Sequence, residues 1–318
     1  MSQTTVVTTS PSSTPVSIAD VDAKNSNSPH GGSKTPYIVG AIAFVLVIIF
    51  IIIVLVFIFV SEELVTHQVI VQNNCSVPME TLLMSGDNSL PATVQPNGTY
   101  KYYVTPGFKG NLTAAASGLT TQACDTPTGL CPYTEIQLAT AGDSNGKVRM
   151  IAQDGKYINL PLVEPILNVD TYDVSMQAGY NISATIQPTS NFKSDSTNTC
   201  GNPVWFSNIT QTDCPVELQY IVNGNYIGCM TACNADIPGP PGPQGDFCCS
   251  EFPCADSSAD FNCQMFWDNQ AYYTTFATAC PDCLITNCDR PNYTCNSSSN
   301  RDLSNYTITL CPNLSTPP

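Results

Sequence analysis

Residues 162–190 read LVEPILNVDTYDVSMQAGYNISATIQPTS and contain two short runs, TYDVSM and YNISATIQP, on either side of a Gly-containing break. Both runs are rich in β-branched and aromatic residues, which pack well on a pleated surface. Neither has the 3.6-residue period of an amphipathic helix. This stretch therefore predicts two strands joined by a turn.

Runs of the same kind recur on both sides of this stretch. They are separated by turn clusters that include QPNG, TPGFKG, AGDSNG, AQDG and VNGN. Such spacing predicts an all-β domain, built as a flattened antiparallel sandwich or barrel. A helix is expected only near Ser258–Thr278. The further runs are THQVIVQNNC (66–75), TYKYYV (99–104), EIQLAT (135–140), KVRMIA (147–152) and NYTITLCP (305–312).

All sixteen cysteines lie between Cys75 and Cys311, three of them in residues 61–199 and thirteen in 200–311. An even number in one domain predicts a disulfide framework in an oxidising compartment. The first part must then be held together by an apolar core, and the loop-rich part, about 200–290, by disulfides. Nine Asn-x-Ser/Thr sequons also follow residue 60, which indicates an extracellular or luminal domain with glycans at Asn74, Asn97, Asn111, Asn181, Asn208, Asn292, Asn296, Asn305 and Asn313.

Residues 37–60 form an uncharged, strongly apolar run. As a helix it would reach about 36 Å, enough to cross a bilayer core of about 30 Å. The alternative, a cleaved signal peptide, fits less well because the run is long and no small-residue cleavage site follows it. Lys24 and Lys34 precede the run, which favours a type II orientation with the N-terminus in the cytosol. We expect a disordered tail over 1–36, a membrane helix over 37–60 and an outer domain over 61–318, in a single-pass protein of a cell surface or a viral envelope.

The charge pattern excludes several functions. Residues 1–36 are neutral, so the formal net charge of −15 belongs to the rest of the chain, which argues against nucleic-acid binding. The only histidines are His30 and His67, which nearly excludes Ser-His-Asp chemistry and a His-ligated metal. No Gly-rich phosphate loop follows a strand, so no nucleotide and no cofactor is expected. Cys280-Pro-Asp-Cys283 has redox-motif spacing, but in such a domain we expect structural disulfides.

From residue 66 onward the sequence resembles the thaumatin-like proteins. The resemblance begins with HQVIVQNNC and the stretch LVEPILNVDTYDVSMQAGYNISATIQPTS. It continues, in the family's order, with TDCPVEL, GCMTAC, FCC followed by Cys254, FATACPDC, NYTC and NYTITLCP. It covers nearly all of residues 66–312. No single motif decides it, but the ordered series is specific.

The resemblance implies six disulfides: Cys75–Cys311, Cys124–Cys131, Cys200–Cys295, Cys214–Cys229, Cys233–Cys248 and Cys249–Cys254. Cys263, Cys280, Cys283 and Cys288 remain. We expect Cys263–Cys280 and Cys283–Cys288, although four cysteines allow three pairings.

The family has an acidic cleft associated with binding of β-1,3-glucans and, in some members, with weak glucanase activity. The positions that match its acids are Glu164, Asp173 and Asp282, and Asp170 could partly substitute for an acid that is Ala178 here. The family's cleft Arg has no counterpart in GNLTAAAS. Because an Arg would hold the acids ionised and oriented, its absence weakens a hydrolase assignment.

Two functional classes follow. The first is a membrane-anchored surface domain that binds glycan or a surface partner without catalysis. The second is a membrane-tethered weak endo-β-1,3-glucanase, or an antimicrobial or defence effector, that uses the cleft carboxylates and needs two of them in different protonation states. We favour binding, and the only partners expected are the lipid bilayer and cell-wall or surface glycans.

The topology can be tested with glycosidase. Because every sequon and cysteine follows residue 60, protein made in a eukaryotic secretory system should migrate faster on a gel after glycosidase treatment. An unshifted band, together with a C-terminus protected from protease in intact cells, would mean that the orientation is reversed.

Overall fold

The computed structural model describes residues 44–51, 65–116, 131–142, 148–160, 168–193, 200–205, 208–232, 234–235, 271–285, 293–297 and 302–312. The chain divides into two compact units, Met1–Glu62 and Glu63–Pro318. In the first unit, residues 44–51 are helical. Within the described ranges, no helix is both long and apolar enough to cross a membrane. The remainder of the run 37–60 and the tail 1–36 lie outside the described residues.

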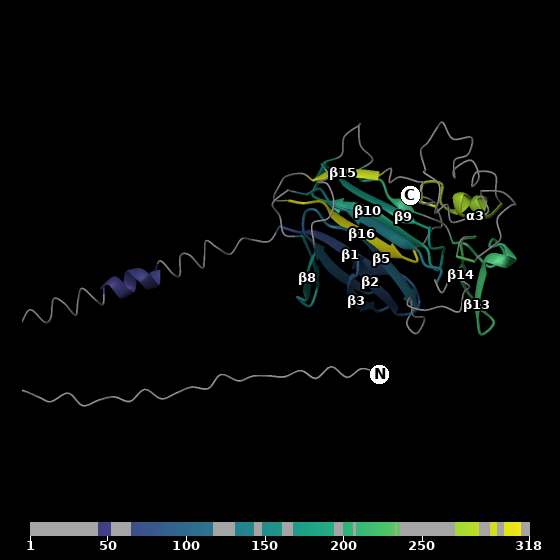
Figure 1. Ribbon diagram of the computed structural model, residues 1–318, viewed down its shortest axis with the longest axis horizontal. Coiled ribbons are helices and arrows are strands. Elements are labelled where there is room, and N and C mark those ends of the chain that lie inside the picture. Colours follow the sequence, from purple (N-terminus) through teal and green to yellow (C-terminus); the bar gives the residue numbers. More distant parts are fainter. Residues whose placement is uncertain are drawn as a thin grey trace, which may run out of the picture. The chain divides into compact units, whose positions relative to one another are not determined.

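The second unit is built on two seven-stranded sheets (Figure 1). The first sheet has the order β12-β10-β16-β1-β4-β7-β8. Its central pair, β1 and β16, runs parallel with Val69 opposite Tyr306, so the start and the end of the domain lie side by side. Its strands are β1 (His67–Asn73), β4 (Thr99–Val104), β7 (Val148–Ala152), β8 (Tyr157–Leu160), β10 (Ala184–Ser190), β12 (Val204–Trp205) and β16 (Asn305–Leu310).

The second sheet has the order β11-β15-β9-β6-β5-β2-β3, and its described pairs are antiparallel. At Gly110 on β5, an added Cβ would lie 2.1 Å from the carbonyl oxygen of Met84, so β2 and β5 can pair at this point only around a glycine. Its strands are β2 (Met79–Ser85), β3 (Asn88–Val94), β5 (Lys109–Ala116), β6 (Glu135–Ala139), β9 (Asp170–Ser175), β11 (Phe192–Lys193) and β15 (Tyr293–Ser297).

One apolar core lies between the two sheets and draws on both of them. The strands alternate as the sequence predicts; in β1, for example, every second residue is buried. Three tyrosines are wholly buried, and the rings of Tyr172 on β9 and Tyr306 on β16 lie 5.7 Å apart across the sheets. Tyr102 on β4 meets the hydroxyl of Thr81 on β2 at 2.9 Å. The predominantly β fold expected from the sequence is confirmed.

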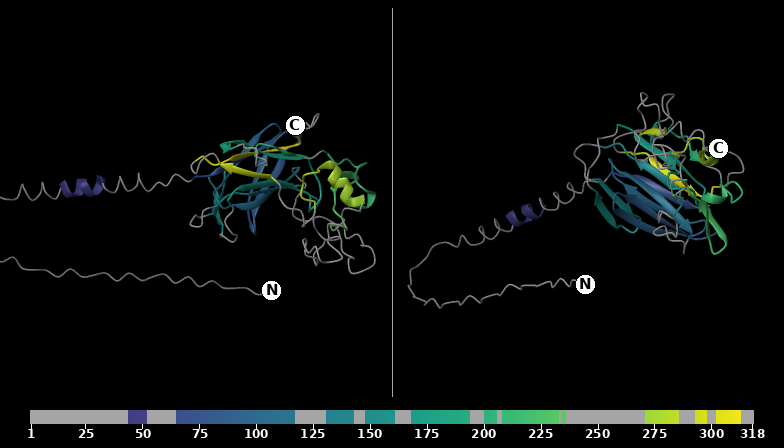
Figure 2. Two further views of the ribbon diagram at one scale, coloured as in Figure 1. Left: turned by 90° about the horizontal axis from the view of Figure 1, so that it is seen from above. Right: turned by 45° about the vertical axis from the view of Figure 1, so that its right-hand side comes forward.

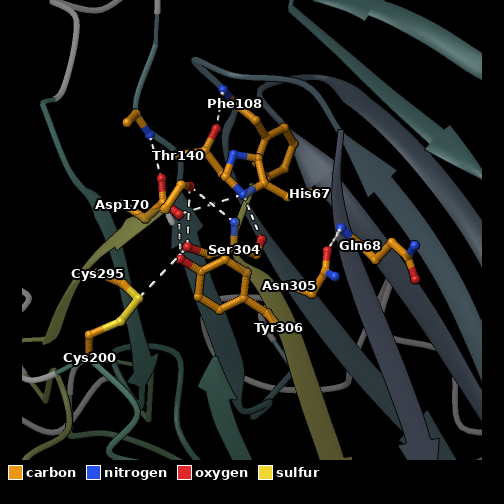
Figure 3. Close-up of polar contacts among 12 residues, drawn as sticks. His67, Gln68, Phe108, Thr140, Asp170, Cys200, Cys295, Ser304, Asn305 and Tyr306 are labelled. Carbon is orange, nitrogen blue, oxygen red and sulfur yellow. Dashed lines mark hydrogen bonds and ion pairs between the residues drawn. A yellow bond between two sulfur atoms is a disulfide. The ribbon is translucent and has the colours of Figure 1, made fainter. Parts of the chain in front are cut away.

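A buried polar cluster also connects the sheets (Figure 3). The carboxylate of Asp170 accepts a 2.5 Å hydrogen bond from the Tyr306 hydroxyl and a 2.7 Å bond from the backbone N–H of Ala141. Its Oδ2 also lies 3.5 Å from Nδ1 of His67. That nitrogen donates to the carbonyl oxygen of Ser304 at 2.8 Å. The cluster therefore joins β1, β9 and β16, and its side chains His67, Asp170 and Tyr306 are all buried.

A smaller region lies at one end of the sheets (Figures 1 and 2). It contains the hairpin of β13 (Gln219–Val222) and β14 (Asn225–Cys229), the 3-10 turn η1 (Val216–Leu218) and the helix α3 (Ala271–Ala279). Phe276 and Ala279 of α3 are buried, and the hydroxyl of Tyr272 donates to Glu217 at 2.8 Å. The helix predicted over Ser258–Thr278 is thus found in its C-terminal part, and its earlier residues lie outside the described ones.

The structure joins Cys75 to Cys311, Cys200 to Cys295 and Cys214 to Cys229, which are three of the pairs that the resemblance implied. It also joins Cys280 to Cys283. The expected pairs Cys263–Cys280 and Cys283–Cys288 are therefore wrong. The reason is local: α3 ends in a turn in which the N–H of Cys283 donates to the carbonyl of Cys280, and their Cα atoms come within 5.4 Å.

The other implied disulfides involve residues without a described placement. Cys131 is disulfide-bonded, but its expected partner Cys124 lies outside the described residues. The same is true of Cys233, Cys248, Cys249 and Cys254, and of Cys263 and Cys288.

The buried histidine predicts a pH-dependent stability. Burial lowers the pKa of His67, and its Nε2 is buried without a hydrogen-bond partner among the described residues. Below the unfolded pKa of about 6.5 the unfolded chain binds a proton that the folded chain does not, so stability should fall as pH drops from 7 to 5. The slope contributed by this residue is at most about 1.4 kcal/mol per pH unit. Denaturant unfolding of the full chain at several pH values measures it.

The variant His67→Asn is the control, because its amide nitrogen can still donate to Ser304 but does not titrate. Its stability should lose this component of the pH dependence. Equal slopes in the two proteins would show that folding does not change the pKa of His67.

The disulfides predict a large difference between two double variants. Cys75–Cys311 closes a loop with a sequence separation of 236 residues, and Cys280–Cys283 one of only 3. On the chain-entropy model the first stabilises by about 5 kcal/mol and the second by about 2 kcal/mol, both as upper figures. Replacing both cysteines of each pair by serine should lower the free energy of unfolding in that order. A larger loss for the short loop would contradict the entropic account.

Candidate functional site

A groove of about 630 Å³ lies along the second sheet, at the end where the β2–β3 hairpin turns. Four segments of that sheet and the edge of the first sheet form its walls. The residues that line it are Met84, Ser85, Gly86, Asp87, Asn88, Gly107, Lys109, Gly110, Asn111, Gln137, Leu138, Ala139, Val148, Leu160, Thr171, Tyr172 and Asp173.

Strand register places a polar row in this groove. Met84 on β2 is opposite Asn111 on β5, Asn111 is opposite Gln137 on β6, and Gln137 is opposite Asp173 on β9. Directly opposed residues point to the same face of a sheet, with Cβ atoms about 5 Å apart. Three hydrogen-bonding side chains from separate parts of the chain therefore stand next to one another in the groove.

Asp173 is the predicted acid that the structure places in the groove. Its side chain is fully buried, and its Oδ1 accepts a 2.8 Å hydrogen bond from the N–H of Val174. The alternation of β9 explains this position. Tyr172 and Val174 point into the core, so Asp173 between them points to the opposite face of the sheet.

Asp282 lies beside the same strand although it does not line the groove. The N–H of Leu284 donates to the carbonyl of Val174 at 2.9 Å, and this pairing lays the segment after α3 along β9. Asp282 is exposed and accepts a 3.0 Å hydrogen bond from Tyr293. Burial raises the pKa of Tyr293 to about 12, with the hydrogen bond to Asp282 and the charges of Asp282 and Asp173 adding to the effect. Asp282 and Asp173 therefore both contribute to the raised pKa of Tyr293.

Asp170 does not lie with these acids, so its predicted role in the cleft is wrong. It is three residues before Asp173 on the same strand, and residues an odd number apart point to opposite faces. Its carboxylate belongs to the buried cluster with His67 and Tyr306 (Figure 3). Burial holds the pKa of Tyr306 well above its usual range, and the charge of Asp170 and its hydrogen bond to Tyr306 add to this effect.

The predicted acid Glu164 lies outside the described residues. Ala178, at the position where the family has another acid, accepts a 2.8 Å hydrogen bond from Nδ2 of Asn234 with its carbonyl oxygen.

Glu135, at the start of β6, is half-buried and was not among the predicted acids. Its Oε1 accepts a 2.8 Å hydrogen bond from Nδ2 of Asn111, and its carboxyl also has hydrogen bonds with Gln137, Tyr133 and Ser175. Burial raises the pKa of Glu135 although these hydrogen bonds oppose the shift. The alternation in EIQLAT could have indicated that Glu135 and Gln137 share a face, but not which residues lie opposite them.

The groove is rich in oxygen atoms. Asp173, Asn111 and Gln137 supply carboxylate and amide oxygens, the exposed Asp87 adds a carboxylate at the hairpin turn, and Lys109 supplies a cation at the rim. Such a surface suits a ligand with many hydroxyl groups, which can donate to several oxygens at once. Among the described residues, no three His, Cys, Asp or Glu side chains come together as metal ligands would.

The predicted glycosylation sites have very different environments. Asn74 and Asn97 are exposed and lie in neighbouring turns, where the N–H of Asn97 donates to the carbonyl of Asn73. Asn208 is exposed and accepts a hydrogen bond from the hydroxyl of Tyr180.

The other described sequons lie in or beside strands. The Nδ2 atoms of Asn111, Asn181 and Asn305 donate to Glu135, Ala114 and Ser190, each at 2.8 Å, so the nitrogen that a glycan would occupy is engaged. Asn296 is half-buried on β15, and Asn292 and Asn313 lie outside the described residues.

Comparison with protein families matches residues 93–312 to the thaumatin family. Two similar proteins come from plants. The pathogenesis-related thaumatin-like protein 3.5 of Cryptomeria japonica is 32% identical over 171 residues, which cover 52% of this chain and 60% of that protein. The PR5-like receptor kinase of Arabidopsis thaliana is 32% identical over 148 residues, which cover 45% of this chain and 19% of the kinase. The chain thus spans less than two thirds of either relative's length.

The family match extends over both sheets from β3 onward and includes the strands that form the groove. Since it covers more than half of the sequence, this chain belongs to the thaumatin family.

Proposed function

We propose that the chain is a membrane-anchored surface protein whose thaumatin-like domain binds a polyhydroxylated glycan, such as a β-1,3-glucan, without cutting it. The observation that supports this most directly is the row of Asn111, Gln137 and Asp173 in the groove. Carbohydrate hydroxyls are both donors and acceptors, and a row of fixed amides and a carboxylate can engage several along one sugar chain.

The membrane anchor and the outer location rest on the sequence. The uncharged run 37–60 is long enough to span a bilayer as a helix. The sequons and the sixteen cysteines all follow it. Disulfides form and persist in oxidising compartments, so the disulfides of the domain support a location on the outer side of the membrane. The bilayer and the surface glycans of a cell wall are then its partners.

A weak glucanase or defence effector is the second candidate. One relative is named a pathogenesis-related protein, and the described carboxyls on the groove's face include Asp173 and Glu135, of which Glu135 has a raised pKa. A glycosidase needs one carboxylic acid and one carboxylate on the two sides of the scissile bond. In this chain, however, the family's cleft Arg has no counterpart and Ala178 replaces a further acid of the family. Binding without catalysis is therefore the function that we favour.

Charge removal tests the site. Asp173→Asn should weaken retention of the full chain on insoluble β-1,3-glucan by about tenfold, since a hydrogen bond to a charged group is worth roughly 1.5–3 kcal/mol. Asp282→Asn should weaken it less, because Asp282 lies beside β9 but does not line the groove. Folding should be little changed because both substitutions keep the side chain's shape. A pull-down with detergent-solubilised protein measures the retained fraction as a function of protein concentration.

Asp154→Asn is the matched control. Asp154 is partly exposed in the β7–β8 turn, pairs with Lys156 at 3.0 Å and does not line the groove, so this variant should bind like the unmodified chain. Equal binding by all four proteins would exclude the groove as the glycan site. Release of reducing sugar from laminarin by the unmodified chain would show that catalysis, and not binding alone, is the function.

A further inference from the structure

A second polar row lies beside the groove row on the same face of the second sheet. Glu135 on β6 is opposite Thr113 on β5 and opposite Ser175 on β9. Glu135 is two residues before Gln137, so the two side chains point to the same side of the sheet. Glu135 does not line the groove itself, but it contacts two residues that do.

These two contacts have a fixed direction. Asn111 donates its Nδ2 to Oε1 of Glu135 at 2.8 Å, and Gln137 also hydrogen-bonds to this carboxyl. An ionised carboxylate only accepts hydrogen bonds, so each amide turns its nitrogen toward Glu135. The carbonyl oxygens of both amides are then directed away from Glu135.

We propose that Glu135 is a positioning residue of the groove: its carboxylate holds the nitrogens of Asn111 and Gln137, so that both amide oxygens face the ligand. This proposal rests on the proposed function, since it concerns the same groove and narrows its ligand. The groove presents two amide oxygens and the carboxylate of Asp173 side by side, which favours a neutral ligand that donates hydrogen bonds from hydroxyl groups. The carboxylates of an acidic polysaccharide are also hydrogen-bond acceptors, so they could form no hydrogen bonds with these three groups of the groove.

Protonation of Glu135 would reverse this arrangement. A carboxylic acid has one O–H donor, and an amide that receives it must turn its oxygen toward Glu135 and its nitrogen toward the groove. Burial raises the pKa of Glu135 above its usual 4.5. As the pH falls, Glu135 is therefore protonated before an ordinary exposed carboxylate is. Binding of a hydroxyl-rich ligand should then be strongest near neutral pH and decline in mild acid.

Other titratable groups share this face of the sheet and define the control. In the described strands they are Glu80 on β2, Lys109 on β5, Asp173 on β9 and Lys193 on β11, with Tyr133 just before β6 and the exposed Asp87 in the β2–β3 turn. Replacing Glu135 by glutamine leaves these groups in place. It alters the pKa of Tyr133, which Glu135 raises, but that phenol stays neutral between pH 7 and pH 4.5. A comparison of the two proteins over this range therefore isolates the titration of Glu135.

The test uses the full chain in detergent and soluble laminarin as the probe, from pH 7 to pH 4.5. Glu135→Gln keeps the shape, but its own NH₂ group competes for the acceptor positions and forces an amide to turn. We expect about tenfold weaker binding at pH 7, which corresponds to the loss of one charge-assisted hydrogen bond. We also expect a smaller decline in acid than the unmodified chain shows. Identical affinities and identical pH profiles would overturn the proposal.

Thr113→Val is the matched control in the same row. The Thr113 hydroxyl is buried and has no hydrogen-bond partner among the described residues, so its removal should leave binding and the melting temperature unchanged or slightly improved. The substitution also removes the Asn111-Leu112-Thr113 sequon. A large gain in binding would mean that Asn111 carries a glycan, in which case its nitrogen is not held by Glu135 and the proposal is wrong.

A second readout separates this proposal from the proposed function. The side-chain ¹⁵N–¹H resonances of Asn111 and Gln137 should shift with pH in the unmodified chain and stay constant in Glu135→Gln, with no ligand present. Absence of laminarin binding together with these shifts would refute the proposed function alone. If these chemical shifts do not change with pH in the unmodified chain, or still change with pH in Glu135→Gln, the positioning role of Glu135 is refuted. This holds whether or not laminarin binds.

Discussion

The orientation of β9 is the constraint on which the rest of this domain depends. Asp170 at the start of the strand points into the protein, where it accepts hydrogen bonds from Tyr306 and from the N–H of Ala141. A carboxylate so placed would be costly without these partners, because a buried charge needs both hydrogen bonds and counter-dipoles. A shift of β9 by one residue would bring Asp173 into the core instead and turn Asp170 out. The buried cluster therefore fixes which acid reaches the groove.

The sequence predicted the strands well, because they follow from local patterns. Alternating apolar residues in HQVIVQN and NYTITL give β1 and β16 their buried faces. The same alternation could have separated Asp170 from Asp173, since three residues along a strand reverse the side. The family resemblance outweighed that simple count and led to the wrong role for Asp170.

The polar row beyond Asp173 could not be predicted in the same way. Asn111, Gln137 and Asp173 lie in the groove because β5, β6 and β9 pair in one particular register. Register depends on the whole sheet, on close approaches such as that at Gly110, and on bonds between distant segments. The pairing of Cys280 with Cys283 could not be predicted either. It depends on the turn that ends α3, which brings the two residues together, and the number of cysteines alone does not determine it.

The groove row and the core row occupy opposite faces of the same strands, and this division has an evolutionary consequence. Leu112 and Ile136 hold the sheet to the core, whereas their neighbours Asn111 and Gln137 line the groove. Substitutions at the two groove positions therefore leave the packing of the core in place. A lineage could exchange amides for acids, hydroxyls or aromatic rings at these points and acquire a new ligand while the scaffold stayed the same. At these two positions recognition and stability can change separately, because they depend on alternate residues of the same strands.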